Sequence, residues 1–106
     1  MRFADKRIIV TGSGRGIGRA IARRFAEEGA AVAICDIDRT TAEATAGEIN
    51  ESGGTALAVE LDVRSTESVR AMLDAVVAEW GRVDVLVNNA GITIAKPVVE
   101  FTEEEW

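Results

Sequence analysis

The chain contains no histidine and no tyrosine, and its only lysines are Lys6 and Lys96. Enzymes use these side chains often for proton transfer, so their scarcity leaves few candidates for acid–base catalysis among the 106 residues. The single cysteine, Cys35, excludes an internal disulfide. We expect it to be a small core residue, because free cysteine is often buried.

The chain also lacks an apolar run long enough to cross a bilayer, and its charged N-terminal stretch MRFADKR is unlike a secretory signal. The net charge of −6 disfavours nucleic acid and anionic membranes as partners, because both select basic surfaces. Hydrophobic residues make up 47% and charged residues 28%, which is typical of a folded protein. We therefore expect one soluble domain with a modest core and a cytoplasmic location.

Short apolar runs alternate with stretches of helical periodicity. The runs at residues 7–11, 31–36, 55–61 and 83–87 are rich in Val, Ile and Leu and are expected to be buried strands. Each of the three stretches between them carries one apolar stripe and ends near a glycine, namely Gly29, Gly53 and Gly81. Ser65 is expected to cap the third helix, and Thr102 with Glu105 has the spacing of a further helix start.

This alternation predicts an α/β fold with a Rossmann-like, doubly wound parallel sheet. We expect an incomplete sheet with strand order 3-2-1-4, the first two helices on one face and the third on the other. The fourth strand would then form an apolar edge that promotes aggregation. Lys96 and Pro97 are expected to lie in a loop.

Four glycines lie within the stretch TGSGRGIG, directly after the first expected strand. The N–H groups at a helix start attract anions, and glycine lets a pyrophosphate approach them. Gly12 would allow the tight turn, Gly16 the approach of a cofactor, and Gly18 close packing of the helix on the sheet. The strict G-x-G-x-x-G spacing is absent, and the loop alone is also compatible with an ordinary flexible turn.

Polar residues follow the other expected strands. Asp36 ends the second strand 20 positions after Gly16, where a carboxylate accepts hydrogen bonds from an adenosine ribose. The alternative is a turn aspartate at the start of the second helix, where Asp38 competes for the cap. The pair Asp62-Val63 and the run Asn88-Asn89-Ala90-Gly91 follow the third and fourth strands. All of these clusters would meet at the carboxyl edge of a parallel sheet, where ligands bind.

The order of these motifs resembles that of the short-chain dehydrogenase/reductase family over essentially all 106 residues. The glycine loop is similar to the family's cofactor loop, Asp62-Val63 to its adenine-contacting pair, and Asn88-Asn89-Ala90-Gly91 to its NNAG motif. The resemblance implies a nicotinamide cofactor and hydride transfer between alcohols and carbonyls. The cofactor-binding positions that it implies are Gly12, Ser13, Arg15, Gly16, Ile17, Gly18, Asp36, Asp62, Val63, Asn89, Ala90 and Gly91.

The family's catalytic Ser, its Tyr-x-x-x-Lys pair and an active-site Asn lie beyond the position matching Trp106. We therefore assign no catalytic residue and no metal ligand in this chain. We expect residues 1–106 to form a single NAD(P)-binding Rossmann domain, truncated at its C-terminal side. Two hypotheses stay open: an oxidoreductase represented by its cofactor-binding half, and a non-catalytic nucleotide-binding module or fragment completed by another chain. A full-length protein of this family is expected to form a homo-oligomer.

NAD is expected rather than NADP. The carboxylate of Asp36 would repel a 2′-phosphate, and the following residue, Ile37, carries no positive charge to offset that repulsion. Arg15 is the complication, since it lies in the glycine loop and could reach a phosphate. The identity of the alcohol or carbonyl substrate is not encoded in these motifs.

Overall fold

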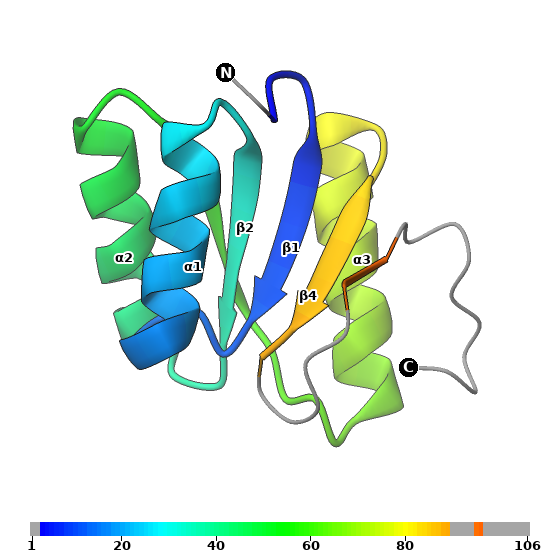
Figure 1. Cartoon of the computed structure of the whole chain (residues 1–106). Helices are drawn as coiled ribbons and strands as arrows, with labels where there is room; N and C mark the ends of the chain where they lie inside the picture. Colours follow the sequence, from blue (N-terminus) through cyan, green and yellow to red (C-terminus); the bar gives the residue numbers. More distant parts are fainter. Residues whose placement is uncertain (1–2, 90–94, 97–106) are drawn as a thin grey trace.

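A computed structural model describes residues 3–89 and 95–96 of the chain. Strands and helices alternate, as predicted (Figure 1). The elements are β1 (Arg7–Thr11), α1 (Gly16–Glu27), β2 (Ala31–Asp36), α2 (Arg39–Glu51), β3 (Thr55–Glu60), α3 (Thr66–Trp80), β4 (Val85–Asn88) and β5 (Ala95–Lys96).

The strands form one sheet in the order β3-β2-β1-β4-β5, and the first four are parallel. The α/β Rossmann-like fold and the strand order 3-2-1-4 are therefore confirmed. The central strand is β1, in which Ile8 pairs with Val32 on one side and with Val85 on the other.

The short strand β5 corrects two predictions. It runs antiparallel to β4 and pairs Lys96 with Leu86. Lys96 thus lies in a strand rather than a loop, and β4 is not the edge of the sheet. The physical reason is that the outer edge of β4 has N–H and C=O groups that need hydrogen-bond partners. Residues Ala95–Lys96 supply those partners.

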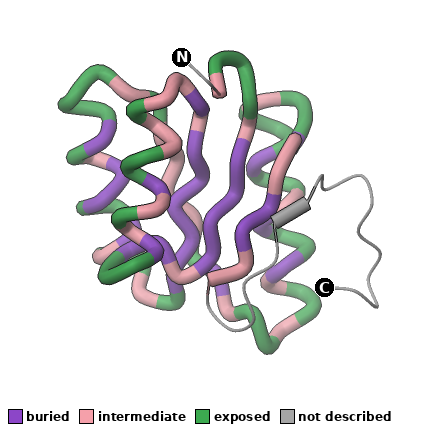
Figure 2. Tube along the Cα trace, in the orientation of Figure 1, coloured by how far each residue is buried: buried purple, intermediate pink, exposed green. Residues whose placement is uncertain are grey.

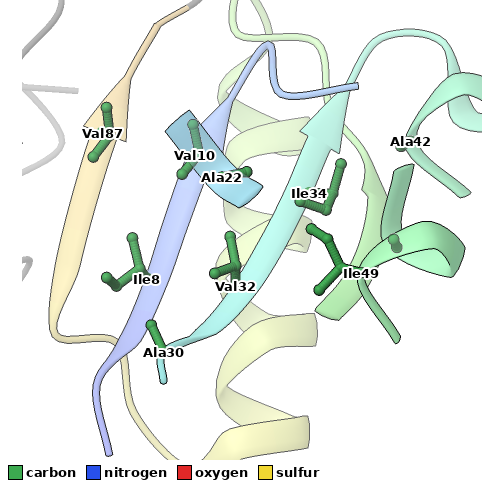
Figure 3. Close-up of a cluster of buried hydrophobic side chains, with 10 residues drawn as sticks. Ile8, Val10, Ala22, Ala30, Val32, Ile34, Ala42, Ile49 and Val87 are labelled. Atoms are coloured by element: carbon green, nitrogen blue, oxygen red, sulfur yellow. The ribbon is translucent and has the colours of Figure 1, made fainter. Parts of the chain in front are cut away.

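The sheet lies between two helical layers, as predicted. Figure 1 shows α1 and α2 on one face and α3 on the other. Side chains that alternate along β1 separate two buried clusters: Ile8 and Val10 pack toward α1 and α2, and Ile9 packs toward α3. Figure 2 shows that burial is concentrated along the central strands β1 and β2, and Figure 3 shows the first of the two clusters.

Some predicted boundaries shift by one or two residues. The third strand ends at Glu60, and the fourth spans Val85–Asn88 rather than residues 83–87. Val83 is apolar because it packs in the cluster beneath α3, not because it belongs to the strand. The carboxylate of Asp84 accepts a hydrogen bond from the Arg7 N–H at 2.8 Å, and this contact aligns the start of β4 with β1.

The predicted helix ends are present. Gly29, Gly53 and Gly81 all have left-handed φ values, and Gly81 is the C-cap of α3. The hydroxyl of Ser65 accepts a hydrogen bond from the Ser68 N–H at 3.1 Å and caps the start of α3. The helix expected from Thr102 lies outside the described residues. Among the helices that the structure describes, none is long and apolar enough to cross a membrane.

Candidate functional site

The glycine loop connects β1 to α1 at the carboxyl edge of the sheet. Gly12 (φ 62°) and Gly16 (φ 61°) both adopt the left-handed conformation, which side chains disfavour. Gly18 lies in the first turn of α1, where an added Cβ atom would be 2.1 Å from the carbonyl oxygen of Gly12. These glycines therefore fix the shape of the loop and bring the helix close to it.

The N-terminus of α1 differs from those of α2 and α3. Its N-cap residue, Arg15, makes no side-chain capping hydrogen bond. By contrast, Asp38 caps α2 and Ser65 caps α3. The first N–H groups of a helix have no partners within the helix, and the helix dipole adds positive potential there. This end of α1 is therefore suited to an anionic group such as a pyrophosphate.

Gly14 is the glycine to which the sequence motifs assigned no role. Its N–H donates to Asp36 Oδ2 at 3.0 Å, and its carbonyl oxygen accepts from Thr45 Oγ1 at 2.6 Å. An added Cβ atom would lie 2.8 Å from Asp36 Oδ2 and 2.9 Å from Thr41 Cγ2. The loop is therefore pressed against the β2–α2 segment, and a side chain at this position has no room.

Ser13 is completely buried, and its hydroxyl is engaged within the protein. Its Oγ donates to the Val10 carbonyl at 2.5 Å and accepts from the Cys35 N–H at 2.9 Å. The side chain thus ties the loop to β2 rather than projecting from it. Cys35 is fully buried, as expected for a core residue, and this burial raises the pKa of its thiol so that it stays protonated.

The structure separates the roles of the two aspartates that follow β2. Asp38 caps α2 by accepting the Thr41 N–H at 3.2 Å, and this hydrogen bond lowers the pKa of the Asp38 carboxyl. Asp36 is only 8% exposed and accepts the Asp38 N–H at 3.1 Å as well as the Gly14 N–H. The helix cap therefore belongs to Asp38, and the Asp36 carboxylate stays beside the loop.

A hollow of about 170 Å³ opens next to Asp36. It is lined by Gly12, Asp36, Ile37, Leu61, Asp62, Val63 and Arg64. Ile37 (59% exposed) and Val63 (38%) present apolar surface there, which suits a flat ring. The Asp62 carboxylate accepts hydrogen bonds from the Arg64 side chain (Nε, 3.1 Å) and from the Arg64 backbone N–H (3.0 Å), and these bonds hold the Asp62 pKa below its usual range.

The end of β4 is tied to the loop through Thr11. Its hydroxyl donates to Asn88 Oδ1 at 3.0 Å and accepts the Asn89 N–H at 2.9 Å. The Asn89 side chain also donates to the Gly12 carbonyl, at 3.4 Å. The asparagines thus hold together the two strands that border the loop.

The structure brings all the described candidates to one edge of the sheet, and only Ala90 and Gly91 lie outside the described residues. Two side chains on the loop are open to solvent: Ile17 is 75% exposed, and Arg15 lies 3.3 Å from the Asp38 carboxylate in an exposed ion pair. Gly14 and Thr45 are the contributors that the motifs did not identify. The crowded glycine run was a signal for Gly14, whereas nothing local pointed to Thr45.

Comparison with known proteins fits this geometry. The family model described as short chain dehydrogenase matches residues 6–106. The chain belongs to the short-chain dehydrogenase family. Within this family it is 44% identical over 106 residues to a sorbitol dehydrogenase of Cereibacter sphaeroides, a match that covers 100% of this chain and 40% of that protein. It is 46% identical over 102 residues to 3beta-hydroxysteroid dehydrogenase 1 of Eggerthella lenta, covering 95% of this chain and 39% of the relative.

Solved structures of hydroxysteroid dehydrogenases share the fold. A hydroxysteroid dehydrogenase from Escherichia coli superposes with a TM-score of 0.81 at 40% identity, covering 82% of this chain and 37% of that one. A 7 alpha-hydroxysteroid dehydrogenase complexed with NADH and 7-oxo glycochenodeoxycholic acid gives a TM-score of 0.80, also at 40% identity, over 82% of this chain and 34% of that one. The chain therefore spans between about a third and two fifths of the length of these dehydrogenases.

Proposed function

We propose that this chain is the dinucleotide-binding part of an oxidoreductase that transfers hydride between NAD and a small alcohol or carbonyl compound. The observation that supports this most is the convergence of three features at one sheet edge: the glycine loop, the uncapped start of α1 and the Asp36 carboxylate. Each feature matches one part of a dinucleotide, and family membership supports the same assignment.

The residues of the site fit such a cofactor. The first N–H groups of α1, at Gly16 and Ile17, suit the pyrophosphate, because no side chain caps them. The hollow beside Asp62 and Val63 suits the adenine. Asn89, Ala90 and Gly91 would border the cofactor beyond the loop, and Ser13 would hold the loop in place.

In the proposed reaction the bound cofactor supplies the carbon that accepts or releases hydride. The residues of this chain have a different task, which is to bind and orient that cofactor. Ile17 would cover it from water, since its side chain is 75% exposed at the start of α1. A fixed orientation matters because it converts an encounter of two molecules into a step within one complex.

A preference for NAD over NADP is supported by the surroundings of Asp36. Its two oxygens each accept one backbone N–H, which leaves further lone pairs for ribose hydroxyls. Its negative charge would oppose a 2′-phosphate. The nearby cation, Arg15, is already paired with Asp38. One solved relative is described as a complex with NADH, which is in keeping with this preference.

Substrate, assembly and location are also proposals. Relatives are named as dehydrogenases of sorbitol, meso-2,3-butanediol and a hydroxysteroid, so we propose a hydroxylated compound or the matching carbonyl as the substrate class. We propose a homo-oligomer for the full-length enzyme. We also propose a cytoplasmic location, in which the free thiol of Cys35 would suit a reducing compartment.

The second candidate is a nucleotide-binding module without catalytic activity, or one completed by another chain. The 106 residues carry the proposed cofactor site and none of the family's catalytic residues, so the same site serves either candidate. Both candidates predict dinucleotide binding. They differ in whether the chain, extended by the segment that carries Tyr-x-x-x-Lys, gains dehydrogenase activity.

The direct test is to titrate the 106-residue chain with NAD, NADP and ADP-ribose by calorimetry, after circular dichroism has shown that the chain is folded. We expect NAD and ADP-ribose to bind and NADP to bind more weakly. A Gly16→Val variant, which places a β-branched side chain at a left-handed position beside the pyrophosphate site, should lose binding. A folded chain that binds none of the three ligands would overturn the proposal.

A further inference from the structure

Three consecutive loop residues are bonded to the β2–α2 segment. Ser13 bonds to Cys35, Gly14 to Asp36 and Thr45, and Arg15 to Asp38. The residues that follow, from Gly16 onward, begin α1 and face the proposed ligand. One half of the loop is thus fixed by neighbouring elements, and the other half presents N–H groups.

Among these partners, Thr45 lies within α2. It is 2% exposed, and its Oγ1 donates to the Gly14 carbonyl at 2.6 Å across 31 residues of sequence. A threonine inside a helix commonly bonds to a carbonyl of its own preceding turn. Here the hydroxyl leaves its own helix and reaches the glycine loop. Valine has the same shape and would fill this space equally well. The presence of a hydroxyl therefore indicates that its hydrogen bond to Gly14 matters.

The bond has a geometric consequence at the loop. Every described peptide bond is trans, so the C=O of Gly14 and the N–H of Arg15 point in opposite directions from one rigid plane. By holding the carbonyl toward α2, Thr45 sets the orientation of that plane. The N–H of Gly14 also donates a hydrogen bond to the Asp36 carboxylate. Gly14 therefore helps to hold the carboxylate that would bind the ribose.

We propose that Thr45 is a positioning residue for the cofactor loop: it sets the Gly14–Arg15 peptide and, through Gly14, the Asp36 carboxylate. This inference rests on the proposed dinucleotide binding. It concerns a residue on α2 that belongs to none of the cofactor motifs. A purely structural hydroxyl would contribute to stability and leave ligand affinity unchanged in the folded chain.

The test compares three variants of the 106-residue chain. Thr45→Val keeps the shape and removes the hydroxyl, and Thr45→Ser keeps the hydroxyl and removes the methyl group. Ile49→Val removes a methylene from the same buried face of α2, away from the loop, and controls for lost stability. For each variant the unfolding midpoint in urea and the dissociation constant of ADP-ribose are measured, the latter where the chain is fully folded.

We expect Thr45→Val to weaken ADP-ribose binding by about tenfold, because the buried Gly14 carbonyl loses its partner and the loop relaxes. Thr45→Ser should bind within about twofold of the wild type, since the donor is retained. Ile49→Val should lose stability and keep its affinity. The Gly14 and Arg15 amide signals in a ¹⁵N spectrum should shift in Thr45→Val and return in Thr45→Ser.

Equal affinity of the wild type and Thr45→Val, with ADP-ribose bound by both, would overturn the positioning role and leave the proposed function intact. The same holds if Ile49→Val weakens binding as much as Thr45→Val does, because affinity would then follow stability. A folded wild-type chain that does not bind ADP-ribose would instead overturn the proposed function, and the positioning role with it.

Discussion

Gly18 and Gly12 pack so closely that a side chain cannot fit between them. A Cβ atom on Gly18 would lie 2.1 Å from the Gly12 carbonyl oxygen and 2.6 Å from Asn89 Nδ2. The first turn of α1, the loop after β1 and the end of β4 therefore meet at one point. Their relative positions define the proposed pyrophosphate site.

The first prediction concerns Gly18→Ala. The clash is with backbone atoms, which cannot move without displacing α1, so we expect a loss of about 2–4 kcal/mol in the free energy of unfolding and loss of ADP-ribose binding. Gly47→Ala is the matched control, because Gly47 lies in α2 with nothing within 4 Å of an added Cβ. It should gain about 0.5–1 kcal/mol, since alanine favours the helix. Urea unfolding measures both changes, and a Gly18→Ala chain as stable as the wild type would contradict the geometry.

The second prediction tests the role of Asp36 in cofactor choice. In Asp36→Ala we expect NAD affinity to fall by about tenfold, because a charged acceptor for the ribose hydroxyls is lost. The ratio of NADP to NAD affinity should rise, since the repulsion of the 2′-phosphate is removed. The ratio is the informative quantity, because loosening of the loop affects both ligands alike. A wild type that prefers NADP, or an unchanged ratio, would show that Asp36 does not select the cofactor.

The third prediction concerns the ion pair between Arg15 and Asp38. Asp38→Asn keeps an oxygen to cap α2 and removes the charge that neutralises Arg15. We expect NADP affinity to rise by about three- to tenfold and NAD affinity to stay the same, because Arg15 would no longer be held by a competing carboxylate and could reach the 2′-phosphate. Glu43→Gln is the control, because it breaks the Arg39–Glu43 pair (3.5 Å) one turn along the same helix. If both variants change NADP affinity equally, the change comes from the overall charge of the protein and not from the release of Arg15.

The fourth prediction is that acid destabilises the chain. Hydrogen bonds lower the pKa of four carboxyls: Asp38 through the Thr41 N–H, Glu48 through the Arg19 side chain, Asp62 through Arg64, and Asp84 through the Arg7 N–H and the Arg82 side chain. A lowered folded-state pKa means that the unfolded chain binds more protons at low pH. This stabilisation is therefore present above about pH 4.5, near the ordinary carboxyl pKa, and is lost as the pH falls through the folded-state values.

Urea unfolding at pH 7, 5, 4 and 3 measures this dependence. The midpoint should be steady between pH 7 and 5 and should fall below that range. Glu48→Gln should flatten the fall, because it removes one of the four carboxyls with a lowered pKa and its pair with Arg19 (2.6 Å). A midpoint that rises on acidification would show that these carboxylates do not favour the folded state.

The fifth prediction is that the 106-residue chain does not oxidise alcohols or reduce carbonyls unaided. It has no tyrosine or histidine to exchange a proton with the substrate oxygen, and a positioned acid–base group contributes about 10²–10⁴-fold to a rate. NAD with a panel of alcohols, and NADH with a panel of ketones, can be assayed by absorbance of the reduced cofactor. Turnover above background in a preparation free of longer protein would show that another group supplies the proton.

Much of the fold was predictable because its signals are local. Apolar runs and helical stripes identified four strands and three helices, and glycines marked the helix ends at Gly29, Gly53 and Gly81. The alternation of strand and helix then determined a parallel sheet and the order of its first four strands, because crossovers of this kind have one favoured hand. The same logic placed Asp36, Asp62 and Asn89 at one edge, since the carboxyl ends of parallel strands lie together.

The tertiary structure decided what depends on partners far apart in sequence. Whether Val83 joins a strand or packs under α3 depends on the alignment with Arg7, and Lys96 enters a strand because the edge of β4 lies beside it. The contact between Thr45 and Gly14 spans 31 residues and leaves no local pattern, because a threonine inside a helix has the same sequence signature whichever carbonyl it meets. The sequence alone therefore determined the first four strands, the three helices and the edge at which they meet, but not β5. The packing of α2 against the loop decided which side chains hold that edge in shape.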